Sequence, residues 1–175
     1  MNPPVLHTVL DETRISQRIT ELAQELLPVL KPNPIILAIL KGAFIFAADL
    51  VRALSRLGVN PRVDFITASS YGVGTSSPGA VQIILDHTLD IRGHPVILLD
   101  EILDSGYTLK TLQTHLINKG AAEVITVVLL DKPSGRQVNV QVDHVGFQVP
   151  DGFMVGYGLD HDGNYRGLPH ISRMQ

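Results

Sequence analysis

The sequence predicts an α/β fold built on a mostly parallel β-sheet. Short apolar runs of strand length alternate with longer segments whose apolar residues recur at helical spacing. Several of the runs are apolar without interruption, as expected for strands that are buried on both faces of a parallel sheet. A chain of 175 residues, 45% of them apolar, is long enough for one compact domain with a sizeable core but too short for two full domains.

The first half of the predicted alternation runs from a helix to a strand and back to a helix. The first helix is expected over residues 14–30, with an apolar face formed by Ile15, Ile19, Leu22, Leu26 and Leu27. The proline-rich segment 31–34 ends it. A buried strand is expected over 35–40, and a second helix over 43–57, which stops at Gly58 in a typical C-terminal cap position.

The alternation continues through the middle of the chain. The β-rich segments 62–69 and 81–85 predict two strands, and the apolar runs 95–99 and 124–130 predict two more. A helix is expected over 107–118. Strands that alternate with helices in this way indicate a parallel sheet with crossover helices.

Two segments depart from this pattern. Residues 69–79 contain three glycines, four serines and a proline, which predicts a long connection without a packed core. After residue 132 the alternation fails, and only 138–142 and 144–149 resemble strands. We expect a single domain over residues 1–175, with a core of about 10–132 and a cap, or hood, of about 133–175 to which N-terminal residues could contribute.

Composition excludes several classes of function. The formal net charge is −3 and the basic residues are scattered, which argues against a nucleic-acid partner. The absence of cysteine excludes disulfides, thiolate metal sites and a cysteine nucleophile. The sequence has neither a secretory leader pattern nor an apolar run of the ~20 residues that a membrane span needs. We therefore expect a cytoplasmic protein that acts on small molecules.

The clearest functional signal begins where the apolar run 96–99 meets two adjacent acids, Asp100 and Glu101. The predicted end of the strand at Leu99 places both carboxylates at its carboxyl end, where open α/β sheets bind ligands. Adjacent residues of a strand point to opposite faces, so both acids could contribute to one site only if the strand has ended before them.

A small-residue turn follows these acids. Ser105 and Gly106 precede the helix predicted from Tyr107, so their backbone N–H groups and the positive helix end can bind a phosphate. The hydroxyls of Ser105 and Thr108 add donors. The segment therefore predicts a site for a sugar phosphate. The alternative is ordinary turn chemistry, in which Asp104 is the N-cap of the helix.

Two adjacent carboxylates followed by Asp-Ser-Gly-x-Thr at 104–108 resemble the phosphoribosyl-pyrophosphate signature of the type I phosphoribosyltransferases. The segments 151–160 and 165–166 look like the hood of the hypoxanthine-guanine phosphoribosyltransferases. Three more segments are similar to that family's first loop, mobile loop and purine-reading loop, in the family's order: 40–43, 70–71 and 129–133. The departures are small, since Asp100 and Glu101 reverse the commoner order and Met154 replaces a β-branched residue.

The resemblance implies a catalytic role for Asp104, which would accept a proton from the purine. It implies substrate contacts by Lys41, Gly42, Ser70, Tyr71, Asp100, Glu101, Ile102, Leu103, Ser105, Gly106, Tyr107, Thr108, Lys132, Gly152, Phe153, Met154, Asp160 and Arg166. Magnesium is the implied cofactor, with Asp100, Glu101 and Asp160 as its expected ligands. The alternative is turn chemistry in Leu-Asp-His-Asp-Gly at 159–163, in which Asp160 or Asp162 caps a loop.

Lys132 and Phe153 are expected at the base. Lys132 would donate to a purine 6-oxo group, which favours hypoxanthine or guanine over adenine. Phe153 would stack on the ring. The alternatives are an exposed lysine and a core phenylalanine. Gly152 and Met154 would contribute backbone groups near the other edge of the base.

The remaining contacts are expected at the leaving group. Backbone groups of Lys41 and Gly42, with the guanidinium of Arg166, would bind pyrophosphate. In the family this loop can contain a cis peptide bond; the alternative is a plain turn. Ser70 and Tyr71 would belong to a loop that closes over the site, unless that loop is only surface.

The resemblance implies purine salvage from hypoxanthine or guanine and phosphoribosyl pyrophosphate, by a homo-oligomer that is a dimer or a tetramer. One alternative is a regulatory protein of the same fold that senses phosphoribosyl pyrophosphate. Another is a phosphoribosyltransferase for another base, such as xanthine. The presence of Asp104, Lys132 and Phe153, together with the lack of a basic patch, favours the enzyme.

Overall fold

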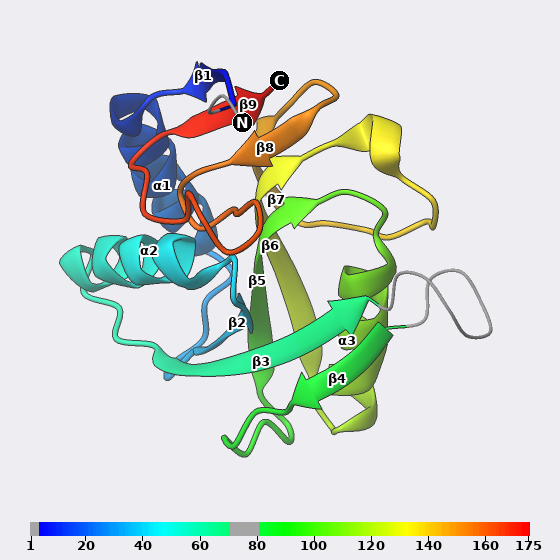
Figure 1. Ribbon diagram of the computed structural model, residues 1–175. Coiled ribbons are helices and arrows are strands. Elements are labelled where there is room, and N and C mark those ends of the chain that lie inside the picture. Colours follow the sequence, from blue (N-terminus) through cyan, green and yellow to red (C-terminus); the bar gives the residue numbers. More distant parts are fainter. Residues whose placement is uncertain (1–3, 71–80) are drawn as a thin grey trace.

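The computed structural model describes residues 4–70 and 81–175, which form two sheets and three α-helices (Figure 1). The large sheet has the strand order β4-β3-β2-β5-β6-β7, with β4 antiparallel and the other neighbours parallel. Its strands are β2 (Ile35–Leu40), β3 (Arg62–Ser70), β4 (Val81–Leu85), β5 (Pro95–Leu103), β6 (Glu123–Asp131) and β7 (His144–Gln148). The predicted α/β class with a mostly parallel sheet is confirmed.

The small sheet brings the two ends of the described chain together. Its order is β1-β9-β8, with both pairings antiparallel. The strands are β1 (Leu6–Leu10), β8 (Phe153–Val155) and β9 (Ile171–Met174). None of the three was predicted as a strand. Figure 1 shows β1 beside β9 at one end of the molecule.

Helices cover both faces of the large sheet. Helices α1 (Glu12–Leu26) and α2 (Phe44–Arg56) pack over one face, where Ile36 and Ala38 of β2 are buried. Helix α3 (Tyr107–Asn118) packs over the other, where the alternate residues of β2 are buried. Burial on both sides explains the uninterrupted apolar runs. None of the helices in the described ranges combines the length and the apolar character that crossing a membrane requires.

The first helix differs from its predicted bounds. It starts earlier, because Asp11 caps it by accepting a hydrogen bond from the Arg14 amide at 2.9 Å. It ends at Leu26 rather than at Leu30, because Pro28 has no amide hydrogen to continue the helical hydrogen bonds. The strands predicted at 35–40 and 81–85 and the helix at 107–118 have their predicted bounds.

Strand β5 is longer than predicted. Pairing with β2 ends at the pair Ala38 and Leu99, but pairing with β6 continues to Leu103. The expectation that the strand ends at Leu99 was therefore wrong. Beyond Leu99, β5 has an open edge on the side of β2, and Asp100 and Glu101 lie along that edge.

The predicted strand at 138–142 is absent, and this segment has no regular secondary structure. Its carbonyl groups are bonded to side chains of α3: Lys110 Nζ donates to Asn139 O at 3.2 Å, and Gln113 Nε2 donates to Gln141 O at 3.0 Å. Strand β7, in contrast, forms as predicted. It pairs in parallel with β6 and so extends the large sheet.

Candidate active site

A cavity of about 560 Å³ opens where β2 ends and β5 continues. Sites at the carboxyl ends of parallel strands are the usual binding sites of open α/β sheets. The predicted contacts among its lining residues are Lys41, Gly42, Asp100, Glu101, Ile102, Leu103, Asp104, Ser105, Gly106, Thr108, Asp160 and Arg166. Residues separated by more than a hundred positions in the sequence thus share one cavity.

Asp100 and Glu101 form a buried acidic pair in this cavity. Asp100 is only 7% exposed, and its Oδ1 accepts a hydrogen bond from the Glu101 amide at 3.0 Å. Burial, followed by the charge of Glu101, holds the pKa of Asp100 well above its usual range. Burial also raises the pKa of Glu101. Both side chains line the cavity although the strand continues through them, because the edge of β5 is open there.

Gly42 lies against the Glu101 carboxylate. A Cβ atom at position 42 would lie 1.7 Å from Glu101 Oε1, so only glycine permits this approach. Among the described residues, Glu101 Oε2 is buried and has no hydrogen-bond partner. The peptide bond between Leu40 and Lys41, just before Gly42, is cis. Because Gly42 lies so close to Glu101, backbone atoms of this loop lie next to a carboxylate oxygen that has no partner among the described residues.

The turn before α3 opens into the same cavity. Gly106 has φ 90°, a left-handed conformation that favours glycine, and it is the N-cap of α3. No side chain caps the helix, so the alternative role of Asp104 as N-cap is wrong. Ser105 and Thr108 line the cavity, and Tyr107 is not among its lining residues. The uncapped helix end offers backbone donors to an anion.

Asp104 is paired with Lys132 across the site. Lys132 Nζ lies 3.2 Å from Asp104 Oδ2, and the side chain of Asp104 is 49% exposed. Arg136 Nη1 donates to the Asp104 carbonyl at 3.0 Å, and Arg136 also forms an ion pair with Asp131. No local pattern in the sequence indicates Arg136, because its contact with Asp104 spans 32 residues.

Asp160 and Arg166 join the cavity from the segment after β8. Arg166 Nη2 lies 2.5 Å from Asp160 Oδ1, and Asp160 Oδ2 accepts the Gly163 amide at 2.8 Å. Asp160 therefore has the alternative turn role and also lines the cavity. In the parts of the chain that the structure describes, no three histidine or acidic side chains are close enough to form a metal cluster by themselves.

The residues expected at the base do not line this cavity. Phe153 is 51% exposed and makes an edge contact with the His161 ring at 5.4 Å, so it is not a core residue. Met154 is buried in the main core. Gly152 and Lys132 also lie outside the lining. Ser70 ends β3, and Tyr71 lies outside the described residues.

Some lining residues were not predicted: Ile39, Leu40, Ala68, Leu109, Gly135 and Gln137. Gly135 lies against the Asp104 carboxylate, since a Cβ atom there would be 1.5 Å from Asp104 Oδ1. The Pro-Ser-Gly sequence at 133–135 is a turn signal that could have indicated it. The amide of Gln137 donates to Ser105 O at 3.0 Å, a contact with no local signal in the sequence.

Comparisons with known proteins identify the family of the chain. Residues 6–162 match the family model of the phosphoribosyl transferase domain. The chain is 44% identical to the hypoxanthine-guanine phosphoribosyltransferase of Aquifex aeolicus, over 95% of this chain and 93% of the relative. It is 41% identical to the hypoxanthine phosphoribosyltransferase of Escherichia coli, over 96% of each chain.

Solved structures give the same result. A structure of Trypanosoma cruzi hypoxanthine phosphoribosyl transferase superposes with a TM-score of 0.92 at 38% identity, over 100% of this chain and 94% of the other. The Staphylococcus aureus hypoxanthine phosphoribosyltransferase gives 0.88 at 35% identity, over 97% and 91%. The similarity of sequence and of structure extends over nearly the whole length of this chain and of its relatives, so the chain belongs to the hypoxanthine-guanine phosphoribosyltransferase family.

Proposed function

We propose that the protein transfers the 5-phosphoribosyl group of phosphoribosyl pyrophosphate to hypoxanthine or guanine, which gives IMP or GMP and pyrophosphate. One observation carries the proposal in a chain of this family. The open amino end of α3, the buried acids Asp100 and Glu101, and the loop at Gly42 face a single cavity. An anion site next to paired carboxylates suits a ligand with a phosphate at one end and ribose hydroxyls at its centre.

The reaction forms a bond between purine N9 and ribose C1′ and breaks the bond from C1′ to pyrophosphate. Positive charge develops on the ribose in the transition state, and the carboxylates of Asp100 and Glu101 stabilise it electrostatically. Asp104 accepts the proton from purine N7 as N9 attacks and returns it in the reverse reaction. Its half-exposed carboxylate at the cavity wall supports this role.

The 5′-phosphate is assigned to the turn before α3. Backbone N–H groups of Ser105, Gly106, Tyr107 and Thr108 bind it, together with the hydroxyls of Ser105 and Thr108. Ile102 and Leu103 are assigned backbone contacts next to it. The left-handed conformation of Gly106, which gives the turn its shape, supports this assignment.

The pyrophosphate is assigned to Lys41, Gly42 and Arg166. Magnesium fits this end of the site, because Glu101 Oε2 is a buried carboxylate oxygen without a partner among the described residues. Magnesium commonly uses one or two carboxylates together with substrate phosphates and water. Glu101, with Asp100 and Asp160, would hold it. When bound, the ion would neutralise charge on the leaving pyrophosphate.

The base is assigned to Lys132 and to the start of β8. Lys132 donates to the 6-oxo group, and Phe153 stacks on the purine, with Gly152 and Met154 at the other edge. The exposure of the Phe153 ring supports a role in stacking, since a core phenylalanine would be buried.

We extend the proposal to the setting of the enzyme. It works in the cytoplasm, because its sugar-phosphate substrate is too highly charged to cross a membrane unaided. It acts as a homo-oligomer, as the resemblance to the family implies. Phe44 and Phe65, which are 42% and 39% exposed, support an apolar contact between copies. Light scattering on the purified protein measures the oligomeric state directly.

A parallel assay of four bases tests the function. The purified protein is supplied with magnesium, phosphoribosyl pyrophosphate and either hypoxanthine, guanine, xanthine or adenine. We expect turnover of hypoxanthine or guanine, and an Asp104→Asn variant should lower kcat by about 10²- to 10⁴-fold. Asp162→Asn, which alters an exposed carboxylate with 88% exposure, is the matched control. Binding of phosphoribosyl pyrophosphate without turnover of any base would refute the proposal.

A further inference from the structure

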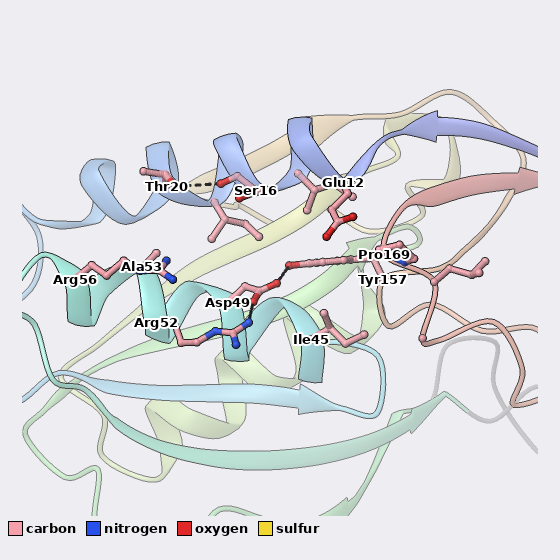
Figure 2. Close-up of a pocket in the computed structure, with 14 residues that line it drawn as sticks. Glu12, Ser16, Thr20, Ile45, Asp49, Arg52, Ala53, Arg56, Tyr157 and Pro169 are labelled. Atoms are coloured by element: carbon pink, nitrogen blue, oxygen red, sulfur yellow. Dashed lines mark hydrogen bonds and ion pairs between the residues drawn. The ribbon is translucent and has the colours of Figure 1, made fainter.

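The segment of residues 156–168 carries Asp160 and Arg166 and is bonded mainly to itself. The Tyr157 amide donates to Leu168 O, and the Gly158 amide donates to Arg166 O, both at 2.9 Å. Among the described residues, a single hydrogen bond joins this segment to the rest of the chain: the Tyr157 hydroxyl donates to Asp49 Oδ2. Figure 2 shows the Tyr157 side chain reaching Asp49 on α2.

Tyr157 is held in an unusual backbone conformation. Its φ is 52°, in the left-handed region that bulky residues rarely adopt. The residue is buried, with only 5% of its surface exposed. Such conformations persist where surrounding contacts hold them, and they concentrate at functional sites. A cavity of about 450 Å³ lies beside the ring, between α1 and α2. Tyr157 packs in the main core, and its hydrogen bond to Asp49 fixes the hydroxyl where both residues border the cavity.

The acceptor lies on the helix that follows the expected pyrophosphate loop. Helix α2 begins at Phe44, directly after the turn that contains Lys41 and Gly42. The residue after Tyr157 touches the same loop, since a Cβ atom at Gly158 would lie 2.0 Å from Gly42 O. One stretch of chain thus contacts the helix through a hydroxyl and the loop through its backbone.

The contacts continue from this stretch to the charged residues of the cavity. Arg166 Nη1 donates to Gly158 O at 2.6 Å, and Arg166 Nη2 pairs with Asp160 Oδ1 at 2.5 Å. Burial, and then Asp49, raise the pKa of Tyr157 above its usual value, so the hydroxyl keeps its proton and donates at neutral pH. Gly158 follows Tyr157 in the chain, and its carbonyl accepts the hydrogen bond from Arg166. Displacement of Tyr157 would therefore shift Gly158 and, with it, the guanidinium of Arg166.

We propose that Tyr157 and Asp49 are positioning residues that hold Asp160 and Arg166 against the Lys41 and Gly42 loop, and so set the affinity for the pyrophosphate end of the substrate. The inference rests on the proposed function. Strand β8, which carries the expected base contacts, is held mainly by its pairing with β9, and Phe153 also makes an edge contact with His161 of the segment. The hydrogen bond from Tyr157 to Asp49, here called the tether, therefore acts chiefly on phosphoribosyl pyrophosphate and much less on the base.

Four variants test the tether. Tyr157→Phe removes the hydroxyl and keeps the ring, and Asp49→Ala removes the acceptor. Asp49→Asn keeps an oxygen that can accept and is the conservative rescue. Arg52→Ala is the matched control, because it removes the ion pair of Arg52 with Asp49 and leaves the acceptor in place. If Tyr157→Phe does not fold, the two Asp49 variants decide whether the hydrogen bond sets the affinity for phosphoribosyl pyrophosphate.

We expect Tyr157→Phe and Asp49→Ala to raise KM for phosphoribosyl pyrophosphate about tenfold, as for a lost hydrogen bond to a charged group. KM for hypoxanthine should stay within about twofold, and kcat should change little. Asp49→Asn, which keeps a neutral acceptor, should fall between Asp49→Ala and the parent, and Arg52→Ala should resemble the parent. Calorimetry with phosphoribosyl pyrophosphate should show the same tenfold loss, and hydrogen exchange should rise in peptides from 156–168 but not from β9.

Other outcomes overturn the tether. A lower Tm with unchanged affinity for phosphoribosyl pyrophosphate would show that the bond is only structural, and equal increases in both KM values would show general loosening. If the parent turns over no purine, the proposed function fails, but calorimetry still decides the tether. A parent that neither turns over nor binds phosphoribosyl pyrophosphate would overturn both.

Discussion

Lys132 Nζ lies 3.2 Å from Asp104 Oδ2, so the residue assigned to the purine 6-oxo group and the residue assigned to the proton on N7 form an ion pair. The side chain of Lys132 is 17% exposed, against 49% for Asp104. Arg136 donates a hydrogen bond to the backbone carbonyl of Asp104. On the proposed assignments, a purine at this position would exchange the carboxylate partner of Lys132 for an oxo group and free the carboxylate to accept a proton.

The Lys132→Met variant should therefore weaken binding of the base more than binding of the sugar phosphate. A site built to donate a hydrogen bond loses affinity strongly when the donor is removed. We expect KM for hypoxanthine to rise at least about tenfold, with KM for phosphoribosyl pyrophosphate nearly unchanged. Lys31→Met, at an exposed lysine, is the control. Equal increases in both KM values would contradict the assignment of Lys132 to the base.

A side chain at position 42 should damage the pyrophosphate end of the site. In Gly42→Ala the new Cβ atom would lie 1.7 Å from Glu101 Oε1, so the carboxylate must move or the loop must shift. Overpacking of this kind costs about 1–3 kcal/mol. We expect a lower Tm and an affinity for phosphoribosyl pyrophosphate reduced at least about tenfold, measured by thermal unfolding and by calorimetry.

The matched control for that variant is Gly167→Ala. A Cβ atom at Gly167 would meet nothing within 4 Å, and this glycine does not have a left-handed φ. Its Tm and its affinity should equal or slightly exceed those of the parent. If Gly42→Ala also keeps the affinity of the parent, the close approach of Gly42 and Glu101 has no role in binding.

Local patterns predicted most of the large sheet and the turn before α3. The apolar run at 35–40 and the β-rich segment at 81–85 gave correct strand bounds because both their composition and their flanking turn residues are local signals. The β5 end was mispredicted because polar residues are unusual in a buried strand, yet pairing with β6 carries it through Asp100 and Glu101 to Leu103.

Contacts between distant segments were not predictable in the same way. The bond between Tyr157 and Asp49 joins residues 108 positions apart, and the ion pair of Lys132 and Asp104 joins residues 28 apart. The sequence shows the residue types but not which of them meet. The strand prediction for 138–142 was wrong for a related reason, since the side chains that donate hydrogen bonds to its carbonyl groups come from α3.

Asp64 should make stability depend on pH. Its Oδ2 accepts hydrogen bonds from Thr88 N at 2.6 Å, Thr88 Oγ1 at 2.9 Å and Leu89 N at 3.0 Å. Burial alone would raise the pKa of Asp64, but the hydrogen bonds from Thr88, Phe65 and Leu89 outweigh it and hold the pKa below its usual value. A carboxyl with a lowered pKa in the folded state stabilises the protein above its unfolded pKa of about 4, and this contribution is lost as the pH falls through the folded pKa.

Asp64→Asn should therefore lower the free energy of unfolding at pH 7 by about 1–2 kcal/mol, a modest value because the site is partly exposed. The corresponding fall in Tm is about 2–8 °C. Thermal unfolding at pH 7, 5 and 3 should show the difference from the parent shrinking below about pH 4. Glu123→Gln, at an exposed carboxylate, should show no such trend. A deficit that is constant with pH would mean that the charge of Asp64 is not what stabilises the contact.

Removal of magnesium should abolish turnover, and Glu101 should set how much of the ion is needed. Glu101 Oε2 is buried and without a partner in the described part of the chain, so it is a carboxylate oxygen available to a cation. Excess chelator should stop the reaction, and added magnesium should restore it. In Glu101→Gln we expect the magnesium concentration for half-maximal rate to rise about tenfold or more, because the site loses one negative charge and one strong ligand.

Two comparisons make the magnesium titration specific. Glu123→Gln removes a carboxylate of the same type far from the cavity and should titrate like the parent. Asp104→Asn should lower the rate at every magnesium concentration without shifting the midpoint, because Asp104 is assigned to the base proton and not to the ion. Full activity in excess chelator would remove magnesium from the mechanism. An unchanged midpoint in Glu101→Gln would instead leave the ion in place and assign its binding to Asp100 and Asp160.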